Sequence, residues 1–229
     1  MYRIIKRCFD FFCALLALIV LSPIFLLTAI GILVSDFGPI FYKANRIGKG
    51  NKPFKMYKFR SMRVLKAPKK GAEASLRPDE DRIFPFGHFI RKAKIDELPQ
   101  LINILNGTMS IIGPRPVAED QFDMFRYGKW KEAAKVPVGL SGPAALYDYI
   151  YGDQITDEKE YMEKVYPTRR ELEYTYVQKA SVWYDIKMII YTVICISYAL
   201  VGKECTWILN ELKQDAEKSM TNMDYADEM

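Results

Sequence analysis

The chain has 229 residues, half of them hydrophobic, which is enough for one medium-sized domain and a membrane element. Its net charge of +5 is uneven: residues 1–70 carry 14 lysines and arginines against 2 acids, and residues 71–229 carry 19 against 26. Four cysteines without a CxxC pair and a single histidine, His88, exclude a cluster of histidine metal ligands and indicate a reducing compartment, so acid–base chemistry falls more naturally to carboxylates.

The first predicted element is an apolar segment with a break at its centre. No charged residue occurs between Phe11 and Ser35, and a straight helix of that length would cross a hydrocarbon core of about 30 Å. Pro23 lacks the amide that would bond to the carbonyl of Ile19, so we expect the helix to kink or break at Ser22-Pro23. Each half is then about half a membrane deep.

Positive charge flanks this segment on both sides, and such flanks tend to stay cytoplasmic. A re-entrant hairpin over residues 1–36 keeps both positive flanks on the cytoplasmic side, whereas a spanning helix would place one of them on the opposite side. A spanning anchor remains an alternative, because membrane helices tolerate proline. A cleaved signal peptide is a less favoured alternative, because the apolar run is too long. The flanking cations are Arg3, Lys6 and Arg7 before the segment and Lys43, Arg46, Lys49, Lys52, Lys55 and Lys58 after it.

A β-hairpin is predicted over residues 39–62, with Gly48-Lys49-Gly50-Asn51 as its turn. Residues 66–82 are polar and contain two prolines, which predicts a mobile loop. A helix follows Pro85 and extends to about Lys94. The hairpin and helices together predict an α+β fold that is mainly helical.

The next element begins at Asp96-Glu97-Leu98-Pro99-Gln100. Leu98, Leu101, Ile102 and Leu105 fall on one helical face, and Asn106-Gly107 ends the helix. We expect Asp96 to be the N-cap, with Glu97 in the first turn. A short apolar strand, Met109–Ile112, then leads into a stiff loop, Gly113-Pro114-Arg115-Pro116.

The C-terminal half is predicted to be helical. Residues 117–135 indicate an amphipathic helix, residues 139–143 a turn, and residues 157–180 a helix of mixed charge. Residues 188–201 are uncharged but short for a span, which favours an interfacial or core helix over a second crossing. From about Glu211 the acidic tail is expected to be loosely ordered. Residues 37–202 are therefore assigned to a membrane-associated catalytic domain and residues 203–229 to a tail.

Several residues are candidates for chemistry. An ionised carboxylate at a helix start can hold Mg²⁺ or attack phosphorus, which singles out Asp96 and Glu97, although a plain helix cap has the same pattern. Arg115 on its stiff loop suits bidentate phosphate binding, or else bonds to loop carbonyls. Further cations are Lys58 and Arg60, at alternate positions of one strand, and Arg91. Together they favour phosphoryl transfer to or from a lipid.

Two other hypotheses compete with phosphoryl transfer. The acid-x-acid pair Asp79–Asp81 would chelate a metal-bound nucleotide in a glycosyltransferase, although its charged loop indicates a solvated segment. A basic stretch can also bind nucleic acid, but here it is joined to a membrane segment, so we expect no nucleic-acid partner.

These motifs resemble the bacterial sugar transferases, also called monotopic phosphoglycosyltransferases. The resemblance runs from residue 6 to about residue 190 and is carried by four segments. They are KRCFDFFCALLALIVLSPIFLLTAI, FKMYKFRSM, KIDELPQLINILNGTMSIIGPRP and ELEYTYVQKASVWYDIKMII. The chain is expected to correspond to the small catalytic unit of the family.

The resemblance implies transfer of sugar-1-phosphate from a UDP-sugar to polyprenyl (undecaprenyl) phosphate, with release of UMP, at the start of membrane glycan synthesis such as exopolysaccharide. It implies that Asp96 is the nucleophile beside Mg²⁺, that Glu97 is its partner, and that Lys58, Arg60, Arg91 and Arg115 bind phosphates. The expected location is the cytoplasmic face of the bacterial inner membrane. Inner-membrane lipids, downstream glycosyltransferases and a second copy of the chain are the further candidate partners.

The chain departs from the family pattern at two places. Residues 137–147 read PVGLSGPAALY, without the glutamine and later arginine of many relatives, so the usual substrate does not follow. Glu173 stands where an aspartate is expected and is kept as a candidate substrate contact. The alternatives are a metal-dependent glycosyltransferase that releases UDP and a non-catalytic scaffold of a glycan assembly complex. The sugar, the pathway and the oligomeric state do not follow from the sequence.

Overall fold

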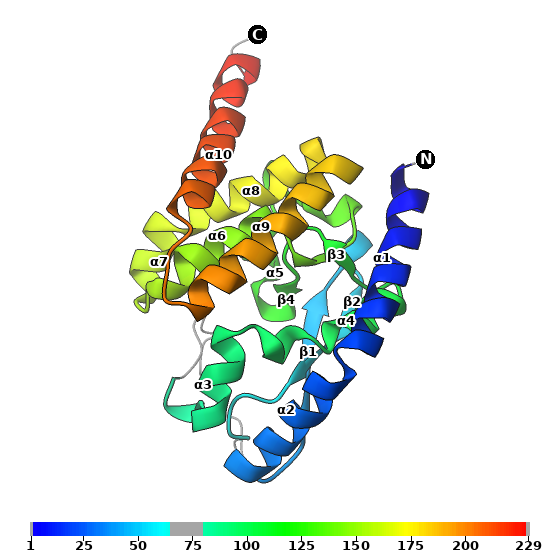
Figure 1. Ribbon diagram of the computed structural model, residues 1–229. Coiled ribbons are helices and arrows are strands. Elements are labelled where there is room, and N and C mark those ends of the chain that lie inside the picture. Colours follow the sequence, from blue (N-terminus) through cyan, green and yellow to red (C-terminus); the bar gives the residue numbers. More distant parts are fainter. Residues whose placement is uncertain (1, 65–79, 228–229) are drawn as a thin grey trace.

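A computed structural model describes residues 2–64 and 80–227 and is mainly helical with small sheets, which confirms the α+β prediction (Figure 1). The predicted loop 66–82 lies outside the described residues up to residue 79. The longer elements are α1 (Tyr2–Val20), α2 (Ser22–Ser35), α3 (Pro85–Lys92), α6 (Pro143–Ile150), α7 (Glu158–Lys164), α8 (Tyr166–Lys179), α9 (Val182–Leu200) and α10 (Thr206–Asp227).

The N-terminal helices confirm the predicted break. The axes of α1 and α2 differ by 60° at Ser22-Pro23. The hydroxyl of Ser22 donates a hydrogen bond to the carbonyl of Ile19 at 2.8 Å, which pairs the acceptor that Pro23 leaves without its helical donor. The serine and the proline therefore act together, one breaking the helix and the other satisfying the freed carbonyl.

Two of the N-terminal cations are used inside the protein. The ammonium of Lys6 is buried and lies 2.8 Å from the carboxylate of Asp185 on α9. The guanidinium of Arg7 donates to the carbonyls of Ile104 and Leu105, at the end of α4 (Gln100–Leu105). Positive charge before the apolar segment therefore fixes α1 to the rest of the fold, a role that the flanking-charge argument did not anticipate.

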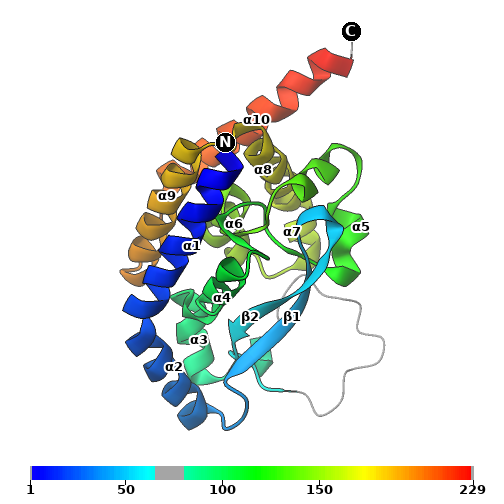
Figure 2. The ribbon, with the colours of Figure 1, turned by 90° about the vertical axis from the view of Figure 1, so that its right-hand side faces the viewer.

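The predicted hairpin forms from β1 (Phe41–Ile47) and β2 (Pro53–Phe59), joined by a short turn at Lys49–Asn51. Ala44 pairs with Met56, and both side chains are buried against α1 and α4. The short strand β4 (Val117–Ala118) adds to the other edge of β1, which gives a sheet in the order β2-β1-β4. Figure 2 shows this hairpin standing beside the helical body.

A second, parallel pair joins β3 (Ser110–Ile112) to β5 (Gly139–Ser141). The strands approach so closely that a Cβ on Gly139 would lie 2.2 Å from the amide nitrogen of Gly113. The amide of Gly139 also donates to the carbonyl of Pro114 at 2.8 Å. The segment that departs from the family pattern therefore holds the Gly-Pro-Arg-Pro loop in place.

The amphipathic helix predicted for residues 117–135 is wrong. The chain there forms β4, two 3₁₀ segments (Glu119–Gln121 and Gly128–Lys135) and the four-residue α5 (Phe122–Phe125). Tertiary contacts outweigh the helical period, because Val117 pairs with β1 and Phe125 is buried against Tyr166 of α8. The helix predicted for residues 157–180 is confirmed as α7 and α8, separated at Val165.

Helices α9 and α10 complete the fold. Helix α9 is long and apolar enough to cross a membrane by length and composition, and the bent pair α1–α2 passes the same test together. Cys195 and Met188 of α9 belong to the core, whereas Val193 on the same helix is 60% exposed. Loose order from Glu211 is wrong, because α10 is helical and packs on α8 through Leu212.

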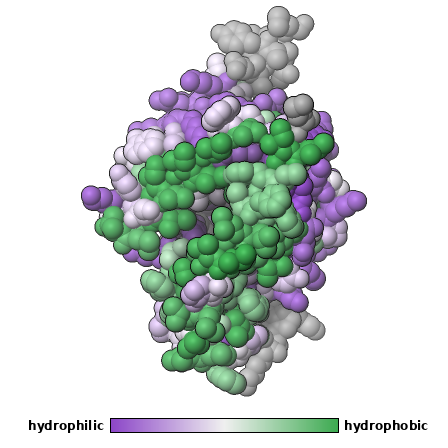
Figure 3. All heavy atoms as spheres, turned by 45° about the vertical axis from the view of Figure 1, so that its right-hand side comes forward, coloured by the Kyte–Doolittle hydropathy of each residue, from purple (hydrophilic) through white to green (hydrophobic). Residues whose placement is uncertain are grey.

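Apolar side chains gather on one face of the molecule, over α1, α2 and α9 (Figure 3). Helices α1 and α9 lie close together there, since Lys6 of α1 bonds to Asp185 of α9. Exposed apolar residues on them include Phe12, Leu16, Ile19, Leu27, Trp183, Ile190 and Val193. An exposed apolar surface of this kind marks an interaction with a membrane or a protein.

Candidate active site

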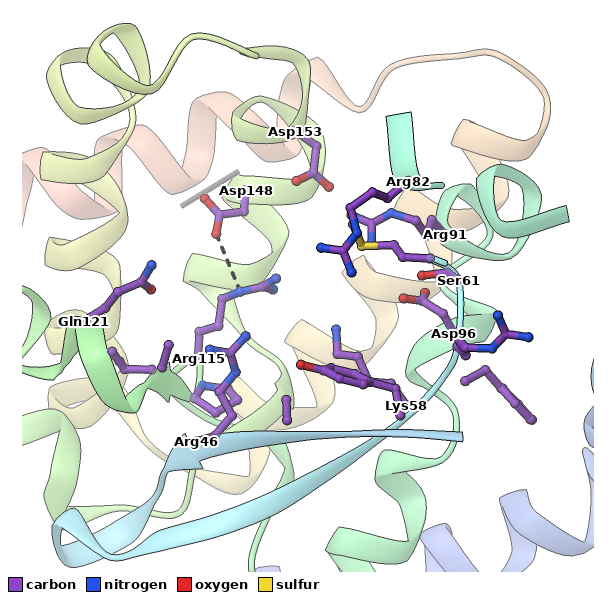
Figure 4. Close-up of a pocket in the computed structure, with 18 of the residues that line it drawn as sticks. Arg46, Lys58, Ser61, Arg82, Arg91, Asp96, Arg115, Gln121, Asp148 and Asp153 are labelled. Atoms are coloured by element: carbon purple, nitrogen blue, oxygen red, sulfur yellow. Dashed lines mark ion pairs between the residues drawn. The ribbon is translucent and has the colours of Figure 1, made fainter. Parts of the chain in front are cut away.

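A cavity of about 680 Å³ opens between the hairpin, α3, the Gly-Pro-Arg-Pro loop and helices α6 to α8 (Figure 4). Its charged side chains are mostly positive, because eight lysines and arginines line it against three aspartates. Such a wall suits a ligand with several negative charges. The cations are Arg46, Lys58, Arg60, Arg63, Arg82, Arg91, Arg115 and Arg169, and the acids are Asp96, Asp148 and Asp153.

Asp96 lies in a single 3₁₀ turn, Ile95–Glu97, so the predicted N-cap role is wrong. Helix α4 begins only at Gln100, after Pro99 has interrupted the amide ladder. Lys94, just before the turn, has a positive φ of 54°, which is uncommon outside glycine. Its ammonium lies 3.0 Å from the carboxylate of Asp153 and over the ring of Tyr149, so contacts hold this backbone in place.

The carboxylate of Asp96 is buried at the cavity wall, with 4% of the residue exposed. Its Oδ1 has no hydrogen-bond partner among the described residues. Burial raises the pKa of Asp96, while Lys58 opposes the shift and Glu97 adds to it. A buried acceptor without a donor has an unmet requirement for a cation or a proton.

Glu97 has the opposite electrostatic environment. Its Oε1 accepts a hydrogen bond from the ammonium of Lys58 at 2.8 Å. Burial acts to raise the pKa of Glu97, but Lys58 and Arg115 outweigh it and hold that pKa well below the usual range. The adjacent acids therefore differ: Glu97 is a fixed anion, and Asp96 keeps an available oxygen.

Arg115 reaches the cavity from its loop, as Figure 4 shows. Its Nε lies 3.8 Å from Asp148, which also accepts a hydrogen bond from Tyr161 at 2.8 Å and faces Arg169 at 3.2 Å. This group of Asp148, Tyr161 and Arg169 was missed by the sequence reasoning. One pattern was available: Arg169, Leu172 and Tyr176 share a helical face, so Arg169 points toward the core.

Five of the predicted site residues line the cavity, whereas Glu173 does not. Lys58, Arg91, Asp96 and Arg115 all line the cavity. Arg60 also reaches its wall, but its guanidinium bonds to the carboxylate and carbonyl of Asp36 and to the carbonyl of Pro39. Arg60 therefore ties the end of α2 to the hairpin, and its donors are engaged by the protein.

Glu173, predicted as a substrate contact, does not line the cavity. It is fully buried and forms an ion pair with Arg126. Arg126 in turn donates to the carbonyl of Arg115 at 3.2 Å. Glu173 therefore acts through Arg126 on the loop that carries Arg115.

The donor set at Asp96 can be compared with what a divalent cation requires. The described residues contain no group of three histidine, cysteine or acidic side chains placed to hold a metal. Mg²⁺ nevertheless binds through one or two carboxylates together with substrate phosphates and water. The unpartnered Oδ1 of Asp96 fits that mode. Of the rival pair, Asp79 lies outside the described residues, and Asp81 is exposed in a 3₁₀ turn.

Sequence similarity to known proteins identifies the family of the chain. The family described as bacterial sugar transferase matches residues 1–198. The UDP-glucose:undecaprenyl-phosphate glucose-1-phosphate transferase of Escherichia coli K12 is 37% identical over 193 residues, covering 83% of this chain and 40% of that protein. An Aeromonas hydrophila UDP-N-acetylgalactosamine-undecaprenyl-phosphate N-acetylgalactosaminephosphotransferase is 36% identical over 203 residues, covering 84% and 43%.

The chain thus spans less than half the length of those two relatives. It is closer in length to the exopolysaccharide production protein ExoY of Sinorhizobium fredii, with 37% identity over 207 residues that cover 84% of this chain and 86% of ExoY. By the extent of the family match and by these identities, the chain belongs to the bacterial sugar transferase family.

Proposed function

We propose that the protein transfers sugar-1-phosphate from a UDP-sugar to polyprenyl phosphate and so initiates a membrane-assembled glycan. The observation that carries the proposal is the buried Asp96 carboxylate, with its unpartnered oxygen, at the wall of a cavity lined by cations. The related enzymes of Escherichia coli and Aeromonas hydrophila are named as transferases of glucose-1-phosphate and N-acetylgalactosamine phosphate to undecaprenyl phosphate, which supports the same substrate classes here.

The first step uses Asp96 as the nucleophile. A carboxylate oxygen attacks the phosphorus that bears the sugar, the bond from that phosphorus to the bridging oxygen breaks, and UMP leaves with the bond electrons. Arg91 and Arg115 neutralise the diphosphate during attack. Lys58 holds Glu97 as an anion, and the pair orients the turn that presents Asp96.

Mg²⁺ is the proposed cofactor, with Oδ1 of Asp96 as its protein ligand. When bound, it would supply positive charge that neutralises the phosphates of the donor. It would also favour the ionised form of Asp96, whose pKa burial raises.

We further propose that α1 and α2 form a re-entrant hairpin and that the catalytic part faces the cytoplasm. The 60° bend and the Ser22 hydrogen bond to Ile19 support a stable break. Cysteine labelling beside residues 9 and 40 in sealed spheroplasts tests this placement. Equal accessibility on the cytoplasmic side is expected, and opposite accessibility would replace the hairpin with a spanning helix.

The activity is tested by incubating the protein with UDP-sugar, Mg²⁺ and polyprenyl phosphate. UMP should be released, Asp96→Asn should abolish release, and mass spectrometry of the quenched reaction should find a phosphosugar on the peptide containing Asp96. Full activity in Asp96→Asn would refute the mechanism. Release of UDP would favour a glycosyltransferase instead, and no nucleotide release a scaffold. The donor panel should contain both UDP-glucose and UDP-N-acetylgalactosamine.

A further inference from the structure

A second, smaller cavity of about 130 Å³ has Glu97 in its wall. Side chains from α6 and α9 form part of its wall, and that wall is largely apolar. Three charged residues, Lys94, Glu97 and Arg115, line it as well. Its remaining lining residues are Leu98, Leu140, Ser141, Ala145, Leu146, Tyr149, Thr192 and Ile196.

The two cavities share a partition. Arg115 lines both of them. Glu97 lines the smaller cavity and pairs at 2.8 Å with Lys58, which lines the larger one. Lys94 lines the smaller cavity and pairs at 3.0 Å with Asp153, which lines the larger one. A group bound in either cavity is therefore next to Arg115 and to one member of each of these two ion pairs.

The lining fits an amphipathic anion. Arg115 and Lys94 offer positive charge to a phosphate, whereas Leu140, Ala145 and Ile196 offer only hydrocarbon contact. Helix α9 also links this cavity to the exposed apolar face, because it carries Ile196 in the cavity wall and Val193 on that face. A free phosphate has no group to occupy the apolar part.

We infer that this cavity receives the first isoprene units of the polyprenyl phosphate, with the phosphate directed to Arg115. The inference rests on the proposed function and adds the route of the acceptor, which enters through a different cavity from the nucleotide. An acceptor phosphate oxygen attacks the phosphorus held on Asp96, the bond between that phosphorus and the Asp96 oxygen breaks, and the carboxylate is restored. Donor and acceptor then use separate entrances to one carboxylate.

Two tryptophan variants on the same helix test this route. Ile196→Trp fills the cavity, whereas Val193→Trp adds the same side chain at an exposed position, 60% accessible, that does not line it. Each variant is assayed for exchange of labelled UMP into UDP-sugar without acceptor, and for transfer to polyprenyl phosphate. Ile196→Trp should raise the KM for polyprenyl phosphate about tenfold, because hydrocarbon contacts are lost. Its exchange rate should stay unchanged, and Val193→Trp should alter neither.

An unchanged acceptor KM in Ile196→Trp would overturn the inference, and so would an equal rise in Val193→Trp. Absence of UMP exchange in the unsubstituted protein would instead count against the covalent step of the proposed function. A diazirine-bearing short prenyl phosphate keeps the test decisive even if Ile196→Trp fails to fold. Photolabelling of the unsubstituted protein should mark the peptides containing Ala145 and Ile196, and labelling confined to α1 and α2 would reject the route.

Discussion

Replacing Glu173 by glutamine tests whether this residue holds the site in place or contacts the substrate. The substitution keeps the shape of the side chain and removes its charge. Arg126 would then remain charged, with 5% of its side chain exposed and no carboxylate at its Nη1. Because Arg126 donates to the carbonyl of Arg115, the loop that carries Arg115 should also lose its anchor.

The magnitude follows from the burial of the pair. Removing one partner of a fully buried ion pair costs about 3–5 kcal/mol, because the other charge is left uncompensated. For a chain of this size each kcal/mol lowers Tm by about 2–4 °C, so Glu173→Gln should unfold about 6–20 °C below the unsubstituted protein. The loss of donor exchange should follow from the displaced Arg115 loop.

The assay is thermal unfolding in detergent together with UMP exchange. Glu163→Gln is the matched control, because Glu163 is exposed on α7 and its change should stay within about 0.5 kcal/mol. Adding Arg126→Met to Glu173→Gln should recover stability but not exchange. A Tm unchanged in Glu173→Gln, or exchange fully restored in the double variant, would refute a positioning role for Glu173.

Three further predictions concern the backbone and the charge at the site. Ser22→Ala should lower the free energy of unfolding in nanodiscs by about 0.6–1 kcal/mol, because the carbonyl of Ile19 loses its donor; an unshifted unfolding curve would contradict that bond. The pKa of Glu97 lies below its unfolded value, so Glu97 adds stability above about pH 4.3 that is lost as pH falls toward the folded pKa. Between pH 6 and 3.5, Tm of Glu97→Gln should therefore fall less than Tm of the unsubstituted protein, and an equal fall would be evidence against the Lys58 pair. Gly139→Ala should cost about 1–3 kcal/mol and slow UMP exchange, because its Cβ would lie 2.2 Å from the Gly113 nitrogen. Gly50→Ala is the control: it strains a backbone of positive φ but meets no atom within 4 Å, so it should keep exchange, and equal exchange in both variants would be the contrary result.

Patterns of neighbouring residues correctly predicted the helix break and the β-hairpin, because each is caused by residues that are close in sequence. The helix break at Ser22-Pro23 follows from a missing amide, and the hairpin from alternating side chains around a glycine-rich turn. Asp96 was found by its motif and family resemblance, but its assignment as an N-cap failed. Helix α4 begins only at Gln100, after Pro99. Before it, the backbone of Lys94 is left-handed, and the side chain of Lys94 contacts Asp153 and Tyr149, which lie far along the chain.

Residues 117–135 show the limit of such patterns most clearly. Their helical period is real, yet Val117 pairs with β1 and Phe125 packs on Tyr166, contacts that no window of neighbouring residues contains. Glu173 was singled out in the sequence because it departs from the family pattern. Its buried ion pair with Arg126 became evident only from the tertiary structure.

Residue types and their spacing along the chain were enough to predict the apolar segment, its break, the excess of positive charge and the carboxylate pair. The tertiary structure alone decided which charges meet. Lys58 pairs with Glu97 across 39 positions, and Arg115 faces Asp148 from a loop held by two close glycines. Long-range packing sets these pairs. It makes Glu97 a fixed anion, whereas the neighbouring Asp96 keeps an oxygen without a hydrogen-bond partner among the described residues.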